Sequence, residues 1–287
     1  MKQLRWREVF SAPKVQWGIG IAICCVSALF LIAACLLRTL QIFYAVDLTT
    51  GFYKEGEPLI PALYAVMAGF FFLMILLVLP LRRGVKEEYY KNPFVGIAVL
   101  LLGLTGLIEF VLNGGLSLEP FFGFSDFFKT NGGPLFLILS WGLGGLTYVY
   151  FGIAFLFFRK KKMPFLWVGV FPIVYAIVRL LVTFMHFTTI AGISQNLFEI
   201  LALTFELVFT LDCMALFAGI TKRGSKKRIV LWGMGSALFA LLVSVPVLIA
   251  LATQNSAILS FIKAPSYTDL CLALFALSVS VSAALTK

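Results

Sequence analysis

The sequence predicts an all-α protein, a polytopic transmembrane bundle of eight helices with both termini in the cytoplasm. The first observation is the composition, since 61% of the 287 residues are hydrophobic and only 13% are charged. Soluble domains are about 45–50% apolar and about 25% charged. The second is a series of eight apolar runs, each close to the roughly 20 helical residues that cross a bilayer core. The third is the placement of the basic residues in alternate loops.

The apolar runs are expected to be helical, because lipid offers no hydrogen bonds and a helix satisfies its backbone within the segment. The loops between them are too short to hold a folded catalytic domain, so residues 1–287 form one integral membrane domain. The eighth run is the shortest. The predicted spans are 17–38, 59–80, 94–113, 135–158, 165–187, 197–220, 229–252 and 268–285.

The basic residues test this threading, since cytoplasmic loops are enriched in Lys and Arg. Of the 23 basic residues, four lie on one side, one (Arg179) lies within a span, and the other 18 lie on the side of the termini. Those 18 are Lys2, Arg5, Arg7, Lys14, Arg82, Arg83, Lys86, Lys91, Arg159, Lys160, Lys161, Lys162, Lys222, Arg223, Lys226, Lys227, Arg228 and Lys287. The four are Arg38, Lys54, Lys129 and Lys263. This asymmetry requires an even number of spans with cytoplasmic termini. The net charge of +10 therefore reports topology and favours contact with anionic lipids, or with a regulatory protein, over nucleic acid.

The first span follows a basic segment and contains Ile32-Ala33-Ala34-Cys35, which resembles the acylation signal of bacterial lipoproteins. Because the apolar run continues through Leu36 and Leu37, we expect an uncleaved first span. Whether Cys35 is acylated stays open.

Two outer loops are long enough to hold structure. Residues 41–58 carry Thr50-Gly51 between aromatic residues, which predicts a small hairpin or turn. Residues 113–134 are bounded by glycine and hold five phenylalanines. This second loop is interpreted as an interfacial segment at the level of the lipid headgroups or, alternatively, as a lid over an outward-facing cavity.

Small residues recur inside the later spans at spacings that suit close contact between helices. They are Gly142, Gly144 and Gly145 in the fourth span, Ser236, Ala240 and Ser244 in the seventh, and Ser278 and Ser282 in the eighth.

The fifth and sixth spans carry ionisable residues, which are costly in lipid and seldom occur there without a partner. Arg179 and His186 are seven residues apart and therefore share a helix face, as do Glu199 and Glu206. The two spans form an antiparallel hairpin around residues 188–196. Arg179 and Glu206 are equally distant from this turn, and so are His186 and Glu199. The register thus predicts two pairs, one above the other.

Tyr175 lies near the same stripe, and Glu109 of the third span lies near its outer end, where it can join this polar ladder. Such a ladder can line a water-filled cavity, bind a small solute or relay protons. Alternatively, it fixes which helices are neighbours, and Glu199 only caps the sixth helix from its position three residues after Asn196. Asp212 falls on another face and is expected to pair with a nearby Lys or Arg.

No catalytic residue, metal site or cofactor is predicted. The five cysteines lie in apolar runs without a CxxC pair, and His186 is the single histidine. Phosphate-loop, dinucleotide-binding and nucleophile-elbow motifs are absent from the sequence. The favoured hypothesis is a small-solute or proton-coupled transporter or binding protein, and the alternative is a non-catalytic scaffold, sensor or assembly partner acting through the basic cytoplasmic loops.

Three stretches together resemble a known group of proteins: Asp47-Leu48-Thr49-Thr50-Gly51-Phe52, Arg179 in the fifth span, and Ile193-Ser194-Gln195-Asn196-Leu197. The chain resembles uncharacterised multi-pass membrane proteins of Gram-positive anaerobic bacteria. The resemblance implies a bacterial cytoplasmic (plasma) membrane protein and attaches no function to it.

Overall fold

The computed structural model describes residues 13–47, 53–81, 92–112, 132–157, 166–186, 193–218, 224–254 and 267–285. Within these residues the fold is all-α with eight α-helices, as predicted, and each predicted span coincides with one helix. The α-helices are α2 (Pro13–Leu40), α3 (Leu59–Val78), α4 (Pro93–Leu112), α7 (Gly132–Phe157), α8 (Val170–His186), α9 (Ile193–Phe217), α10 (Ser225–Ala252) and α12 (Tyr267–Leu285). Two short helices, η1 (Gln41–Ala45, a π-helix) and η3 (Leu166–Gly169, a 3-10 helix), extend α2 and precede α8.

The chain is a multi-pass membrane protein. Six of its helices are long and apolar enough to cross a membrane. The other two are represented by shorter apolar stretches, Trp141–Phe157 of α7 and Trp167–Leu181 of η3 and α8. Large apolar side chains also cover the outside of the bundle. Leu29, Ile32 and Leu36, for example, are 69%, 61% and 59% exposed on one face of α2. An apolar face of this kind suits contact with lipid and not with water.

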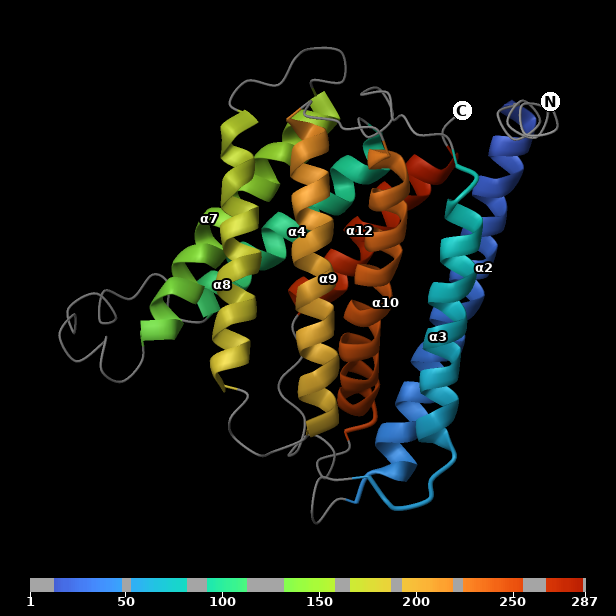
Figure 1. Cartoon of the computed structure of the whole chain (residues 1–287). Helices are drawn as coiled ribbons and strands as arrows, with labels where there is room; N and C mark the ends of the chain where they lie inside the picture. Colours follow the sequence, from blue (N-terminus) through green and yellow to red (C-terminus); the bar gives the residue numbers. More distant parts are fainter. Residues whose placement is uncertain are drawn as a thin grey trace.

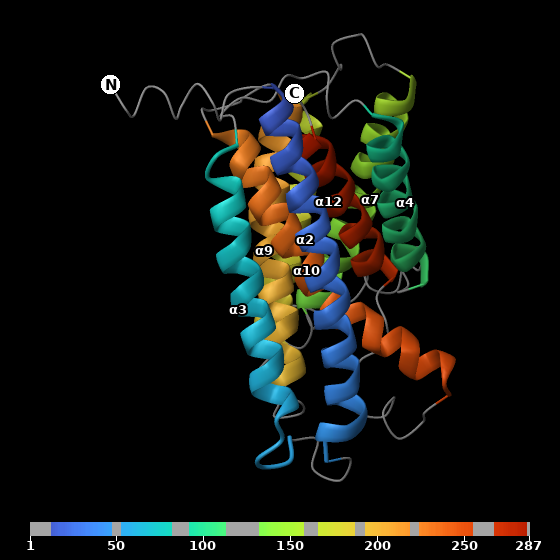
Figure 2. The same cartoon turned by 90° about the vertical axis from the view of Figure 1, so that its right-hand side faces the viewer.

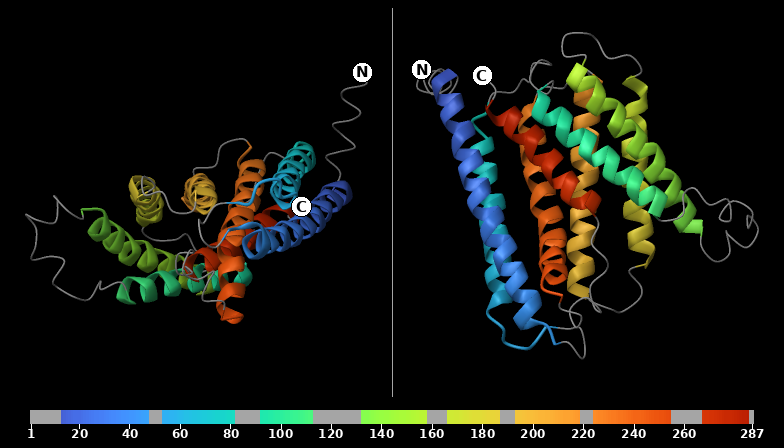
Figure 3. Two further views of the ribbon diagram at one scale, coloured as in Figure 1. Left: turned by 90° about the horizontal axis from the view of Figure 1, so that it is seen from below. Right: turned by 180° about the vertical axis from the view of Figure 1, so that it is seen from behind.

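The helices form two layers and one edge hairpin. α8, α9 and α10 stand side by side, while α12, α4 and α7 cross behind them at a tilt, and α2 and α3 pair at one edge (Figures 1 and 3). α2 begins and α12 ends at the same end of the bundle, here called the terminal end (Figure 1). α12 begins about half-way along α9, so its first turn lies inside the bundle and not at the opposite end (Figures 1 and 3).

Close contact between α4 and α7 depends on glycine. A Cβ atom on Gly103 of α4 would lie 2.5 Å from the Val149 backbone nitrogen and 2.8 Å from the Gly145 carbonyl oxygen on α7. Gly152 of α7 similarly faces the backbone of Leu100. Only glycine at these positions permits the observed distance between the two helices.

α10 is bent, and its lower part diverges from the rest of the helix (Figure 2). Pro246 lies inside this helix, where its ring removes the hydrogen bond to the carbonyl four residues earlier. Two residues before the proline, the Ser244 hydroxyl donates to the Ala240 carbonyl at 2.7 Å. Proline therefore accounts for the change of direction.

At the terminal end, side chains from α2 and α10 bind the last carbonyls of the α3 segment. Gln16 donates to the Pro80 carbonyl at 3.0 Å, and the Lys227 ammonium donates to the Leu79 carbonyl. These contacts satisfy acceptors that the end of a helix leaves unpaired.

At the opposite end, Val46 and Tyr53 form an isolated antiparallel bridge, and Lys54 N donates to the Ala45 carbonyl at 2.8 Å. The hairpin predicted within residues 41–58 is therefore confirmed at its base. Residues 48–52, like 113–131 of the other loop, lie outside the described part of the chain.

Candidate functional site

Arg179 lies at the centre of a buried polar cluster. It occupies the middle of α8, on a face opposite exposed apolar residues such as Ile177 and Leu181, and is itself 8% exposed. A charged residue at the centre of a transmembrane helix costs about 2.5–3.5 kcal/mol on insertion scales, so it requires compensation from neighbouring groups. The cluster supplies that compensation from four other helices.

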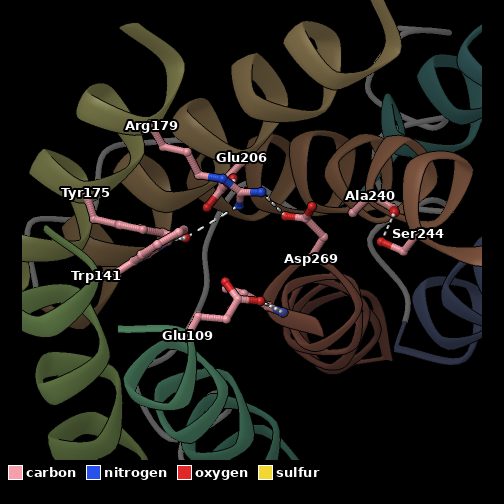
Figure 4. Close-up of polar contacts among 9 residues, drawn as sticks. Glu109, Trp141, Tyr175, Arg179, Glu206, Ala240, Ser244 and Asp269 are labelled. Carbon is pink, nitrogen blue, oxygen red and sulfur yellow. Dashed lines mark hydrogen bonds and ion pairs between the residues drawn. The ribbon is translucent and has the colours of Figure 1, made fainter. Parts of the chain in front are cut away.

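The first partner is Glu206, which occupies the middle of α9 and is 2% exposed. Arg179 Nη1 lies 3.3 Å from Glu206 Oε2 (Figure 4). The antiparallel packing of α8 on α9 brings the two side chains to one level, as their equal distance from the turn predicts.

The second partner is Asp269, whose contact with Arg179 is not predicted from the sequence. It lies in the first turn of α12, and its Oδ1 forms an ion pair with Arg179 Nη2. Figure 4 shows the guanidinium between the two carboxylates. Asp269 falls at the expected start of a span, where a charged residue normally faces the headgroups. Its isolation in an otherwise apolar segment was the available signal.

Aromatic residues close one side of the cluster. The Tyr175 hydroxyl accepts a hydrogen bond from Trp141 Nε1 of α7 at 3.2 Å and from Arg179 Nη1 at 3.5 Å. Tyr175 packs directly against Gly144 of α7, where a Cβ atom would lie only 3.1 Å from the Tyr175 Cβ. Tyr175 thus contacts Arg179 from one helical turn away, where its position in the sequence predicts it.

Glu109 joins the cluster through α12. Its Oε1 accepts a hydrogen bond from the backbone N–H of Thr268 at 3.1 Å, so a carboxylate of α4 caps the beginning of α12 (Figure 4). A negative charge at this position is favoured by the dipole of the helix. The cap therefore fixes Asp269, one residue further on, beside Arg179.

We expect Glu109→Ala to lower the stability of the protein by about 1 kcal/mol, because the first turn of α12 loses its cap. The loss is measurable as a lower melting temperature in detergent. Glu109→Gln keeps an oxygen acceptor and should lose less. Equal melting of the Ala variant and the wild type would show that the cap contributes nothing.

Two buried hydroxyls lie close to Glu206. Thr210 is one turn further along α9, and Tyr148 projects from α7 within electrostatic range of Glu206 and Tyr175. Their relative exposures are 0% and 2%. The two hydroxyls are within hydrogen-bonding reach of each other. Thr268 Oγ1, in the first turn of α12, has no hydrogen-bond partner among the described residues. Buried hydroxyls therefore flank the cluster beside Glu206 and at the start of α12.

The second predicted pair, His186 with Glu199, stays a prediction. His186 is the last residue of α8, and its side chain lies outside the described part of the structure. Glu199 is partly buried on α9, close enough to Asp269 to repel its carboxylate, as Glu109 also is. Glu199 thus adds negative charge to the same region.

Two other charges have defined partners. Asp212 forms the expected pair with a basic residue, since its Oδ1 lies 2.9 Å from Arg228 Nη2 near the terminal end. Arg38, the last residue of the predicted first span, lies in the last turn of α2 and is buried, with 1% exposure. Its Nη1 donates to Gln41 Oε1 at 2.6 Å and to the Tyr53 hydroxyl at 2.5 Å, and its guanidinium lies 4.6 Å above the Phe198 ring. Arg38 therefore connects α2 to α9 and to Tyr53 of the hairpin base.

No family model, no curated protein and no solved structure matches the chain. The resemblance to membrane proteins of anaerobic bacteria consequently has no identified homologue behind it, and the site must be interpreted from its own geometry.

Proposed function

We propose that this protein is a proton-coupled transporter, or binding protein, for a small solute, and that the cluster around Arg179 is its binding site. In this proposal the eight helices are eight spans with both termini in the cytoplasm. The membrane is the bacterial cytoplasmic membrane, whose anionic lipids meet the basic loops.

The observation that carries the proposal is one guanidinium shared by two carboxylates, all three from different helices and all buried. Arg179 stays charged at any working pH, so ionised Glu206 and Asp269 together give the trio a charge of −1. A surplus negative charge in lipid requires a proton or a cation. Purely structural pairs need no such surplus.

The start of α12 supports the same function. Helices that begin inside a bundle are a recurring feature of transporter sites, because their first N–H groups point at polar ligands. The first turn of α12 is occupied by Asp269 and by the Glu109 cap, next to the unpartnered hydroxyl of Thr268. Movement of α12 would change all three contacts together.

The proposed topology has a direct test. Reporter tags at residue 1 and residue 287 should both be accessible only from the cytoplasm, and a tag in loop 113–134 only from outside. Tags on opposite faces would contradict the eight-span topology, whatever the function.

The function is tested first by thermal shift of the purified protein against a panel of small solutes at mildly acidic and neutral pH. A specific binder stabilises the folded state, so at least one solute should raise the melting temperature, by an amount that depends on pH. That solute should then enter proteoliposomes faster when a pH gradient is imposed. Asp212→Asn, on the same helix as Glu206 but paired with Arg228, is the matched control and should transport normally. Uptake that ignores the gradient, or that survives Arg179→Gln unchanged, would contradict the proposal.

The alternative, a scaffold acting through basic cytoplasmic loops, has weaker support. Three residues of the Lys222–Arg228 cluster make contacts within the protein: Lys226 is buried, Lys227 binds the Leu79 carbonyl, and Arg228 pairs with Asp212. Basic side chains engaged in this way are poor candidates for a docking surface.

A further inference from the structure

We infer that Glu206 is the proton-binding group of this site, and that Asp269 is the permanent counter-charge of Arg179. The inference rests on the proposed function and assigns its ligand, a single proton, to one carboxyl group. The proton comes from water and returns to water. It bonds to a Glu206 carboxyl oxygen, and no other covalent bond changes.

The geometry distinguishes the two carboxylates. Asp269 makes the closer ion pair with Arg179, and it lies in the first turn of α12, where the helix dipole stabilises a negative charge. Glu206 lies 3.3 Å from the guanidinium and in the middle of α9, far from either end of that helix. Its side chain is 2% exposed, against 12% for Asp269. Glu109 and Glu199 repel the Asp269 carboxylate, whereas neither acts on Glu206. The closer ion pair, the helix dipole and the greater exposure of Asp269 oppose this repulsion, so we assign the ionised form to Asp269 and the surplus proton to Glu206.

The surroundings of Glu206 allow the proton to be released as well as held. The hydroxyls of Tyr148 and Thr210, which interact with each other, lie near Glu206, and either can turn to donate a hydrogen bond to the carboxylate that forms when the proton leaves. The charged and titratable groups around Glu206 are then Arg179 and Tyr175 on α8, Tyr148 on α7 and Asp269 on α12. Arg179 is the single cation in this set, so no second positive charge competes with the proton.

Infrared spectroscopy of the purified full-length protein tests the assignment. Wild type should show the carbonyl stretch of a protonated carboxyl group, and this band should disappear as the pH is raised. Labelling Glu side-chain carboxyls with ¹³C should shift the band, whereas labelling Asp carboxyls should not. Glu206→Gln should remove the band, and the matched variants Glu109→Gln and Asp212→Asn should retain it.

Stability gives a second measurement. If Glu206 is protonated, Glu206→Gln replaces one neutral group with another of the same shape, and the melting temperature should stay that of wild type. Asp269→Asn should lower it clearly. A band that shifts with the Asp label, a band that survives Glu206→Gln, no band in wild type, or a lower melting temperature for Glu206→Gln would each overturn the inference. A failure to find any transported solute would leave these results unchanged, so the two proposals fail separately.

Discussion

Replacing Arg179 with glutamine is expected to destabilise the protein by about 3–5 kcal/mol, which is the usual effect of removing one partner from a buried ion pair. Glutamine retains much of the length of the side chain, so lost packing contributes little. The loss arises because the Asp269 carboxylate then remains buried without its cation, and because Glu206 and Tyr175 each lose a hydrogen bond from the guanidinium. Reversible unfolding in mixed detergent, or the melting temperature, measures the effect.

A double-mutant comparison identifies which carboxylate matters. Arg179→Gln combined with Asp269→Asn should recover most of the lost stability, because both members of the closer ion pair are then neutral. Arg179→Gln combined with Glu206→Gln should recover less of the lost stability. Arg179→Gln combined with Asp212→Asn should recover none of it. Equal stability of all three double variants would mean that Arg179 acts through packing and not through charge.

Much of the fold follows from the sequence, because lipid imposes strong and simple rules. Apolar runs of span length must be helices, and the alternation of the basic residues predicts which end of each helix faces the cytoplasm. The Arg179–Glu206 contact was also predictable, since α8 and α9 are consecutive and antiparallel, so their register follows from counting residues to the turn. The same local logic gave Asp212 a basic partner near the terminal end.

Asp269 was not predictable by such counting. It reaches Arg179 only because α12 packs against α4 and α10 and begins half-way along the bundle, and the sequence of α12 alone fixes neither feature. The burial of Arg38 was not predictable for a related reason. The first span was expected to end at Arg38, whereas α2 and η1 continue to Ala45, so Arg38 lies inside a longer helical segment instead of at its end.

Gly103→Ala is expected to destabilise the protein by about 1–3 kcal/mol, the usual effect of overpacking a close contact. The added methyl group meets backbone atoms of Val149 and Gly145, which cannot rotate away as a side chain would, so α4 and α7 must separate. Gly103→Leu should prevent folding. Gly106→Ala is the matched control on the same helix. Its nearest neighbour, the Gly145 Cα, is 3.6 Å away, so its melting temperature should equal or exceed that of wild type.

This contact also supports the site, because α4 carries Glu109 six residues after Gly103 and α7 carries Trp141 one residue before Gly142. If separation of α4 from α7 withdraws Glu109 from the Thr268 N–H, adding Glu109→Ala to Gly103→Ala should cause a smaller further loss than Glu109→Ala causes in wild type. In the Gly106→Ala background the full loss should return. A cap that Gly103→Ala has already withdrawn cannot be removed a second time, so the two changes should not be additive. If the stability losses add strictly in both backgrounds, the glycine contact stabilises the bundle independently of the polar cluster.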